Sequence, residues 1–94
     1  MRPIHPGEIL REEFLGPLDM SANVFAHAIC VPANRVSAIL NEERGVTADT
    51  ALRLAQALGT TPQFWMNIQQ SYDLRTAQQD REVAIELRRI RKVV

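Results

Sequence analysis

The chain of 94 residues lacks the features that mark secreted, membrane-spanning or disulfide-stabilised proteins. Its single cysteine, Cys30, has no second cysteine to pair with, so an internal disulfide is excluded and a reducing, cytoplasmic setting is expected. No apolar run approaches the roughly 18–20 residues that are needed to cross a bilayer, so a membrane span is not expected. The N-terminal segment also lacks the continuous apolar stretch of a secretory signal.

The chain also lacks a net charge, because eleven basic residues balance eleven acidic ones. This balance argues against strong non-specific binding of nucleic acid, since that affinity comes from neutralised phosphates, but it leaves room for a small basic face. The charges are unevenly placed. Residues 1–80 carry six basic and nine acidic side chains, whereas residues 81–94 carry five basic and two acidic ones. Length and charge together predict one domain over residues 1–80 and a basic C-terminal extension over residues 81–94.

The chain does contain clear signals for the start and end of helices. Capping residues and prolines predict five helices, which open at Pro6, after Ser21, at Pro32, after Thr47 and at Thr61-Pro62. Gly16-Pro17 is expected to end the first helix and Gly59 the fourth. His5 is the expected cap of the first helix, and the Glu8 carboxylate is expected to reach back to the N–H of His5. No stretch before residue 80 alternates with the period of a strand, so the expected fold class is all-α.

Apolar residues recur at helical spacing in each of these segments and predict the core. The expected buried positions are Ile9, Leu10, Phe14, Val24, Phe25, Ala28, Ile29, Val36, Ile39, Leu40, Ala51, Leu52, Leu54, Ala55, Leu58, Phe64 or Trp65, Ile68, Tyr72 and Leu74. The extension fits two structures equally well, a helix with Val83, Leu87, Ile90 and Val94 on one seam or a short strand through Val83, Ile85 and Leu87.

The second and third helices are the most informative pair. Two short helices that cross steeply need a small residue at their closest approach, and Ala26 supplies one. The turn between them needs an apolar residue beneath it, which Val31 or Ile29 can provide. The third helix then buries Val36 and Leu40 and leaves a polar side, formed by Ala33, Asn34, Arg35, Ser37 and Ala38.

This arrangement is the one by which a helix-turn-helix offers its second helix to the major groove of DNA. Asn34 can pair bidentately with adenine, and Arg35 can reach guanine or a phosphate. Ala33 and Ala38 can approach the bases or meet a thymine methyl. Ser37, Asn41 and Arg44 are better placed for contacts with the DNA backbone. The alternative is an ordinary helical hairpin whose exposed residues only meet solvent.

The sequence resembles the helix-turn-helix proteins related to the phage repressors (the XRE family), and more narrowly the HigA/VapI-type antitoxins of bacterial toxin–antitoxin modules. The resemblance extends from residue 5 to about residue 80. It rests on an ordered series of matches at residues 5–10 (HPGEIL), 31–37 (VPANRVS), 39–41 (ILN), 44–54 (RGVTADTALRL), 61–67 (TPQFWMN) and 72–74 (YDL).

The resemblance implies a five-helix phage-repressor-like domain that binds operator DNA as a homodimer. It also implies a protein that represses its own operon and neutralises a cognate HigB-like toxin, an mRNA endonuclease. The readout positions of the family fall on Ala33, Asn34, Ser37 and Ala38, with Arg35 beside them. Cys30 stands where glycine is usual in the turn, and the extension lies outside the shared pattern. A stand-alone transcriptional regulator of the same family is the alternative.

The remaining candidate residues are given structural interpretations. His5 and Glu8 lie one turn apart but lack the further ligands of a zinc site, so no metal or other cofactor is expected. His27 is interpreted as a surface or packing residue, and Cys30 as a turn residue. No nucleophile or acid–base pair assembles, so an enzyme is the weakest hypothesis.

Two regions leave an interaction role open. The aromatic residues of the fifth helix are expected in the core, with a dimer interface as the alternative for one or two of them. The basic cluster Arg88–Lys92 is a solvated terminus, a phosphate contact beside the operator, or a docking segment for an acidic partner surface. A protein whose main role is to mask a toxin through this extension is therefore a second hypothesis.

Overall fold

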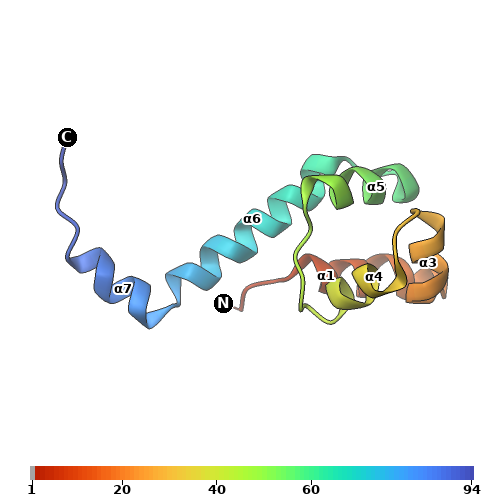
Figure 1. The fold of residues 1–94 in the computed structure, drawn as a ribbon, viewed down its shortest axis with the longest axis horizontal. Coiled ribbons are helices and arrows are strands. Elements are labelled where there is room, and N and C mark those ends of the chain that lie inside the picture. The colour runs from red at the N-terminus through yellow and green to blue at the C-terminus, as the bar shows by residue number, and fades with distance from the viewer. Residues whose placement is uncertain (1) are drawn as a thin grey trace.

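The computed structural model describes residues 2–94, which form helices and turns and no strand. The helical segments are α1 (Pro6–Ile9), η1 (Leu10–Leu15), α2 (Gly16–Leu18), α3 (Ala22–Ala28), α4 (Ala33–Leu40), α5 (Ala48–Leu58), α6 (Pro62–Gln78) and α7 (Arg81–Arg88). Because α1, η1 and α2 follow one another without a break, the part up to Gln78 contains five helical stretches, and α7 is added after them (Figure 1). The all-α fold class is confirmed.

The first helical stretch begins at Pro6, as predicted, but only one of the two predicted capping bonds is present. His5 caps it, since its Nδ1 accepts a hydrogen bond from the backbone N–H of Gly7 at 2.9 Å. Glu8 pairs instead with Arg2, whose two terminal nitrogens lie 2.6 and 3.2 Å from the two carboxylate oxygens. The expected bond from Glu8 to the N–H of His5 is therefore wrong, because a guanidinium engages both carboxylate oxygens.

The expected helix stop at Gly16-Pro17 is also wrong, because the helical backbone continues through both residues to Leu18. Residues Leu10–Leu15 form a wider π turn, and the N–H of Gly16 bonds to the carbonyl of Arg11, five residues back. A wider turn directly before Pro17 accommodates a ring that has no N–H to donate and that crowds the preceding carbonyl. The stretch ends at Asp19, which adopts the left-handed conformation with φ of 51°.

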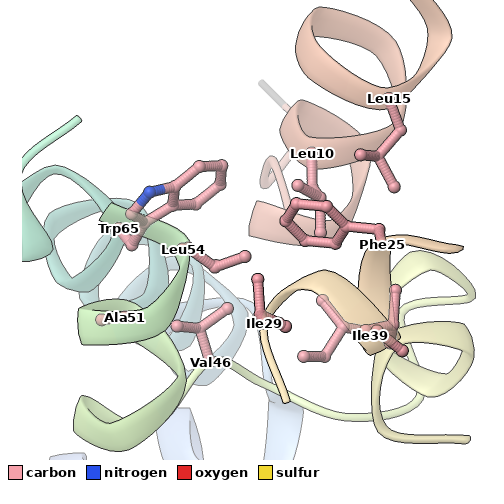
Figure 2. Packing of buried hydrophobic residues seen from close by; sticks show 11 residues of the cluster. Leu10, Leu15, Phe25, Ile29, Ile39, Val46, Ala51, Leu54 and Trp65 are labelled. Carbon is pink, nitrogen blue, oxygen red and sulfur yellow. The ribbon is translucent and has the colours of Figure 1, made fainter. Parts of the chain in front are cut away.

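One hydrophobic core joins all five helical stretches, and side chains such as Leu10, Phe25, Ile39 and Leu54 converge in it (Figure 2). Trp65 is fully buried in this core, and its Nε1 donates a hydrogen bond to Oγ1 of Thr60 at 2.7 Å. Phe64 is 39% exposed and meets the Trp65 ring edge-on, with the centroids 5.1 Å apart. Of the two aromatic residues that the spacing left open, Trp65 is therefore the core residue.

Four residues that were expected in the core are exposed, namely Val24, Ala28, Leu52 and Leu74. In α3 the reason is the rotation of the helix. Phe25, Ala26 and Ile29 share the buried side, so the opposite side carries Val24 and Ala28 into solvent. The small residue Ala26 lies on the buried side.

The predicted starts of α5 and α6 are confirmed. Oγ1 of Thr47 accepts a hydrogen bond from the N–H of Thr50, and Oγ1 of Thr61 accepts one from Phe64. Gly59 ends α5 in the left-handed conformation with φ of 73°, which an L-residue rarely adopts. These caps are local in sequence, which is why the sequence alone predicted them.

Residues Arg81–Arg88 of the C-terminal segment form helix α7, so the alternative of a short strand is wrong. The Asp80 carboxylate accepts hydrogen bonds from the N–H groups of Glu82 and Val83, at 2.9 and 3.2 Å, and so starts α7. The molecule measures 49 Å along its longest axis, and α7 lies at the opposite end of that axis from α3 (Figure 1). Among residues 2–94, no helix is long and apolar enough to span a membrane.

Candidate nucleic-acid interface

A tight turn joins α3 to α4. Ser21 caps α3 by accepting a hydrogen bond from the N–H of Val24 at 3.2 Å. At the other end, the N–H of Val31 bonds to the carbonyl of Ala26 at 3.0 Å, and the N–H of Cys30 bonds to that of His27 at 3.2 Å. Cys30 holds a φ of 61°, the left-handed conformation that glycine usually supplies at this point. The turn therefore keeps its shape although the glycine is replaced.

The underside of α4 is fixed by packing. Val36 and Ile39 are buried, as is Ile29 at the end of α3, while Leu40 is only half-buried where full burial was expected. Gly7 lets α1 approach α4 closely, because a Cβ at Gly7 would lie 1.8 Å from the carbonyl oxygen of Ile39. Arg11 then donates a hydrogen bond to the carbonyl of Leu40 at 2.6 Å. The C-terminal half of α4 is thus anchored to the first helical stretch.

The opposite side of α4 presents a row of short and polar side chains. Successive residues of a helix are rotated by about 100°, so positions 33, 34, 37, 38 and 41 share one side. Ala33, Asn34 and Asn41 are exposed, whereas Ser37 and Ala38 are half-buried, although they were expected to be exposed. We call these five residues the α4 outer face. It contains most of the residues that the sequence singled out for DNA contact.

Two of the singled-out residues lie outside this face. Arg35 points to the flank of α4 next to α5 and is half-buried, which differs from the exposed position expected for it. Arg44 is exposed in the connection between α4 and α5. Both arginines line an open hollow of about 400 Å³ together with Gly45, Thr47, Asp49 and Thr50. The structure therefore brings two cationic side chains together beside α4.

Arg35 belongs to a network that connects three helices. Oδ2 of Asp49 accepts a hydrogen bond from Nη1 of Arg35 at 2.8 Å and one from Nε of Arg53 at 3.0 Å. Nη1 of Arg53 donates to the carbonyls of Ile29 and Cys30, at 2.9 and 3.2 Å. The guanidinium of Arg53, and then that of Arg35, holds the pKa of Asp49 below its ordinary value. The carboxylate is therefore charged at neutral pH.

Sequence reasoning missed the roles of Asp49 and Arg53. Their spacing of four residues on a predicted helix is the one signal that indicates a pair. Gln69 was also missed: it is buried in α6, and its Oε1 accepts a hydrogen bond from the N–H of Val46 at 2.7 Å. Gln69 thereby fixes the connection that carries Arg44. No periodic pattern identifies a polar residue that bonds across 23 positions of the chain.

The other candidate residues have structural roles. His5 is buried as the cap of α1, and its ring meets Tyr72 edge-on with the centroids 4.7 Å apart. His27 is exposed, and Cys30 is an exposed free thiol. Within residues 2–94, no group of three or more His, Cys, Asp or Glu side chains is arranged to hold a metal ion.

Comparison with known proteins agrees with this geometry. A family model described as helix-turn-helix matches residues 10–65. Virulence-associated protein I of Dichelobacter nodosus is 51% identical over 82 residues, which cover 87% of this chain and 76% of the relative. The chain therefore belongs to the helix-turn-helix family, and the resemblance found in the sequence is confirmed.

Solved structures of antitoxins are also similar. The Pseudomonas aeruginosa antitoxin HigA with the higBA promoter is 46% identical, with a TM-score of 0.90 over 99% of this chain and 100% of that one. The antitoxin GraA in complex with its operator is 50% identical, with a TM-score of 0.90 over 100% of this chain and 94% of that one. Both likenesses extend over α7 as well as over the part that the family model matches.

Proposed function

We propose that the chain is the antitoxin of a HigBA-type toxin–antitoxin module. In this proposal it is a cytoplasmic protein without enzymatic activity that binds operator DNA as a homodimer and represses its own operon. It also neutralises a HigB-like toxin, an mRNA endonuclease. Residues 1–80 form the DNA-binding domain and residues 81–94 a basic extension. The observation that carries the proposal is the α4 outer face. The opposite side of the same helix is packed rigidly against the core.

The relatives support the DNA-binding part of this proposal. HigA of Pseudomonas aeruginosa is described with the higBA promoter, and GraA in complex with its operator. In a homodimer, two copies of α4 enter successive major grooves about 34 Å apart, which makes the operator an inverted repeat. Dimerisation doubles the base contacts of a small module, and each good pairing adds about 1–3 kcal/mol of discrimination.

Each residue of the interface has a proposed contact. Asn34 pairs with adenine, and Ala33 and Ala38 lie against thymine methyl groups. Arg35 uses guanidinium donors other than the one bonded to Asp49 to reach a guanine or a phosphate. The residues that contact the DNA backbone are Ser37, Asn41 and Arg44.

The test is the substitution Asn34→Ala, measured on operators from the DNA upstream of the gene with one base pair changed at a time. The variant is expected to lose about tenfold of the preference at one base pair in each half-site, the effect of losing one bidentate contact. Asn67→Ala removes an exposed asparagine side chain from α6 and is expected to keep the full preference. Unchanged selectivity of the Asn34→Ala protein would contradict the assignment of Asn34.

A second role, as a module that masks a toxin, is supported by the exposed face of the extension. On α7 and the residue that follows its cap, Val83 is 37% exposed, Leu87 58% and Ile90 68%. Val83 and Leu87 lie on one side of α7, and an apolar side of a helix is normally buried against another element. We propose that the toxin covers it. The extension and the α4 outer face then serve different partners.

A further inference from the structure

We propose that Asp49 is a positioning residue for α4: its bonds to Arg35 and Arg53 orient the α4 outer face and thereby determine how well it distinguishes the operator from other DNA. This inference rests on the proposed function. It assigns to Asp49 a role in specificity although Asp49 lies outside the α4 outer face. The network of hydrogen bonds described above is the observation that carries it.

Asp49 is placed to fix both helices of the helix-turn-helix to α5. Through Arg35 it holds the first turn of α4, at 2.8 Å. Through Arg53, at 3.0 Å, it orients the guanidinium that binds the carbonyls of Ile29 and Cys30. Those carbonyls directly follow the last residue of α3. The carbonyl groups at the end of a helix have no N–H partner within the helix and need one from elsewhere. One carboxylate therefore links the start of α4 and the end of α3 to the same helix.

Directional hydrogen bonds add to the packing that fixes the underside of α4. The buried side chains Val36 and Ile39 keep α4 on the core, but hydrophobic contact has no directional preference. Hydrogen bonds are directional, and α4 has one such anchor at each end. Arg35–Asp49 holds the first turn, and Arg11 holds the carbonyl of Leu40 in the last. Without Asp49, α4 keeps its packing and the hydrogen bond at its C-terminal end, but the start of the helix loses its directional anchor.

The network is expected to matter more for reading DNA than for stability. The side chains of Asp49, Arg53 and Arg35 are 57%, 37% and 31% exposed, and exposed ion pairs stabilise a fold only weakly. Contacts with base edges, in contrast, require placement to within about 0.5 Å. A small rotation of α4 therefore leaves the fold intact and weakens discrimination between bases.

The charge of Asp49 has an effect of the opposite sign, which makes the proposal testable. A carboxylate beside the DNA repels phosphates. If Asp49 acts only through its charge, its removal raises the affinity for any duplex. If Asp49 positions α4, its removal lowers the affinity for the operator in particular. The two explanations therefore predict changes in opposite directions for the same substitution.

The experiment compares the full-length wild type with Asp49→Ala and with the charge-matched control Glu43→Ala. Glu43 is an exposed acid in the connection after α4. Binding is measured to the upstream operator and to an unrelated duplex of equal length, over a series of salt concentrations. Asp49→Ala is expected to lower the ratio of operator affinity to non-specific affinity about tenfold, the size of one lost base contact. Glu43→Ala is expected to leave the ratio unchanged.

Two further variants separate positioning from a general loss of folding. Arg53→Gln keeps the carboxylate but removes the guanidinium that binds the end of α3, and it is expected to lower the same ratio. In the Asp49→Ala background, Asn34→Ala is expected to have a smaller effect than in the wild type, because Asn34 is already misplaced. Thermal unfolding is measured on every variant and is expected to remain cooperative with a similar midpoint.

The outcomes are distinguishable. A wild type that binds both duplexes equally overturns the proposed function and, with it, this inference. If the wild type discriminates and the Asp49→Ala protein discriminates equally well, the inference alone is overturned. The same holds if Asp49→Ala raises operator affinity in parallel with Glu43→Ala, because charge then explains the result.

Discussion

At the scale of single residues, three positions within residues 2–94 hold the left-handed conformation without being glycine: Asp19, Cys30 and Glu42. Asp19 directly follows α2, whereas one residue separates Cys30 from the end of α3 and Glu42 from the end of α4. In each case the next N–H bonds back to a carbonyl five residues earlier. This closing pattern usually has glycine at its left-handed position. The turn before α4 thus contains a Cβ that its backbone conformation disfavours.

Replacing Cys30 with glycine is expected to stabilise the protein. Left-handed backbone is disfavoured for an L-residue by roughly 1–2 kcal/mol, while glycine loses about 0.5–1 kcal/mol more conformational entropy on folding. The net expectation for Cys30→Gly is a rise of about 0.5–1 kcal/mol in the free energy of unfolding, measured by urea denaturation. Cys30→Ala keeps the Cβ and is expected to change little. Equal or lower stability of the glycine variant would show that the turn is unstrained.

His5 is expected to make the stability depend on pH. Burial lowers the pKa of His5 below its ordinary value of about 6.5, and the carboxylates of Glu42 and Asp73 oppose this only in part. The unfolded chain therefore takes up a proton near pH 6.5, while the folded chain resists it. Stability is fully present above about pH 6.5 and is lost as the pH falls below that value towards the lowered pKa of the folded state.

The measurement is the free energy of unfolding between pH 7.5 and pH 5, compared with that of His5→Asn. Asparagine keeps an acceptor for the N–H of Gly7 and does not titrate, so the variant is expected to show a flatter profile over this range. Parallel profiles for the two proteins would mean that His5 does not cause the loss.

At the scale of helices, the sequence predicted what is local. The caps at Ser21, Thr47 and Thr61 and the end of α5 at Gly59 depend on residues within one turn, and all four are confirmed. The continuation through Pro17 was not predictable in this way, because it depends on a π turn that no spacing rule indicates. Helix starts were therefore easier to predict than the end of the first stretch.

The helix-turn-helix shows the same division between local and distant contacts. The outer position of Asn34 follows from helical periodicity, and the sequence predicted it. The flank position of Arg35 depends on Asp49, fourteen residues further along the chain, and the connection that carries Arg44 depends on Gln69. Contacts between distant polar residues leave no periodic pattern, so the sequence identified the surface but not the bonds that orient it.

At the scale of the whole molecule, charge and shape separate two regions. Residues 1–80 carry a net charge of −3 and residues 81–94 a net charge of +3. The extension lies far along the 49 Å axis from the helix-turn-helix (Figure 1). A protomer that places its α4 in the major groove therefore leaves its own α7 accessible. This separation favours the docking interpretation of the extension over a phosphate contact at the same half-site.

Deletion of residues 81–94 is expected to abolish toxin binding and to leave operator binding intact. The folded part up to Gln78 contains the complete core, so the shortened protein is expected to unfold at a similar temperature. The measurements are capture of the protein encoded by the adjacent reading frame and binding to the upstream operator.

In the full chain, Leu87→Asp is expected to reproduce the loss of capture, because a charge on the apolar side of α7 opposes its burial. Arg91→Ala removes one charge and keeps that side apolar, so it is expected to retain capture. Capture that survives both the deletion and Leu87→Asp would place the toxin contact on residues 1–80, and operator binding with no captured partner would indicate a stand-alone regulator.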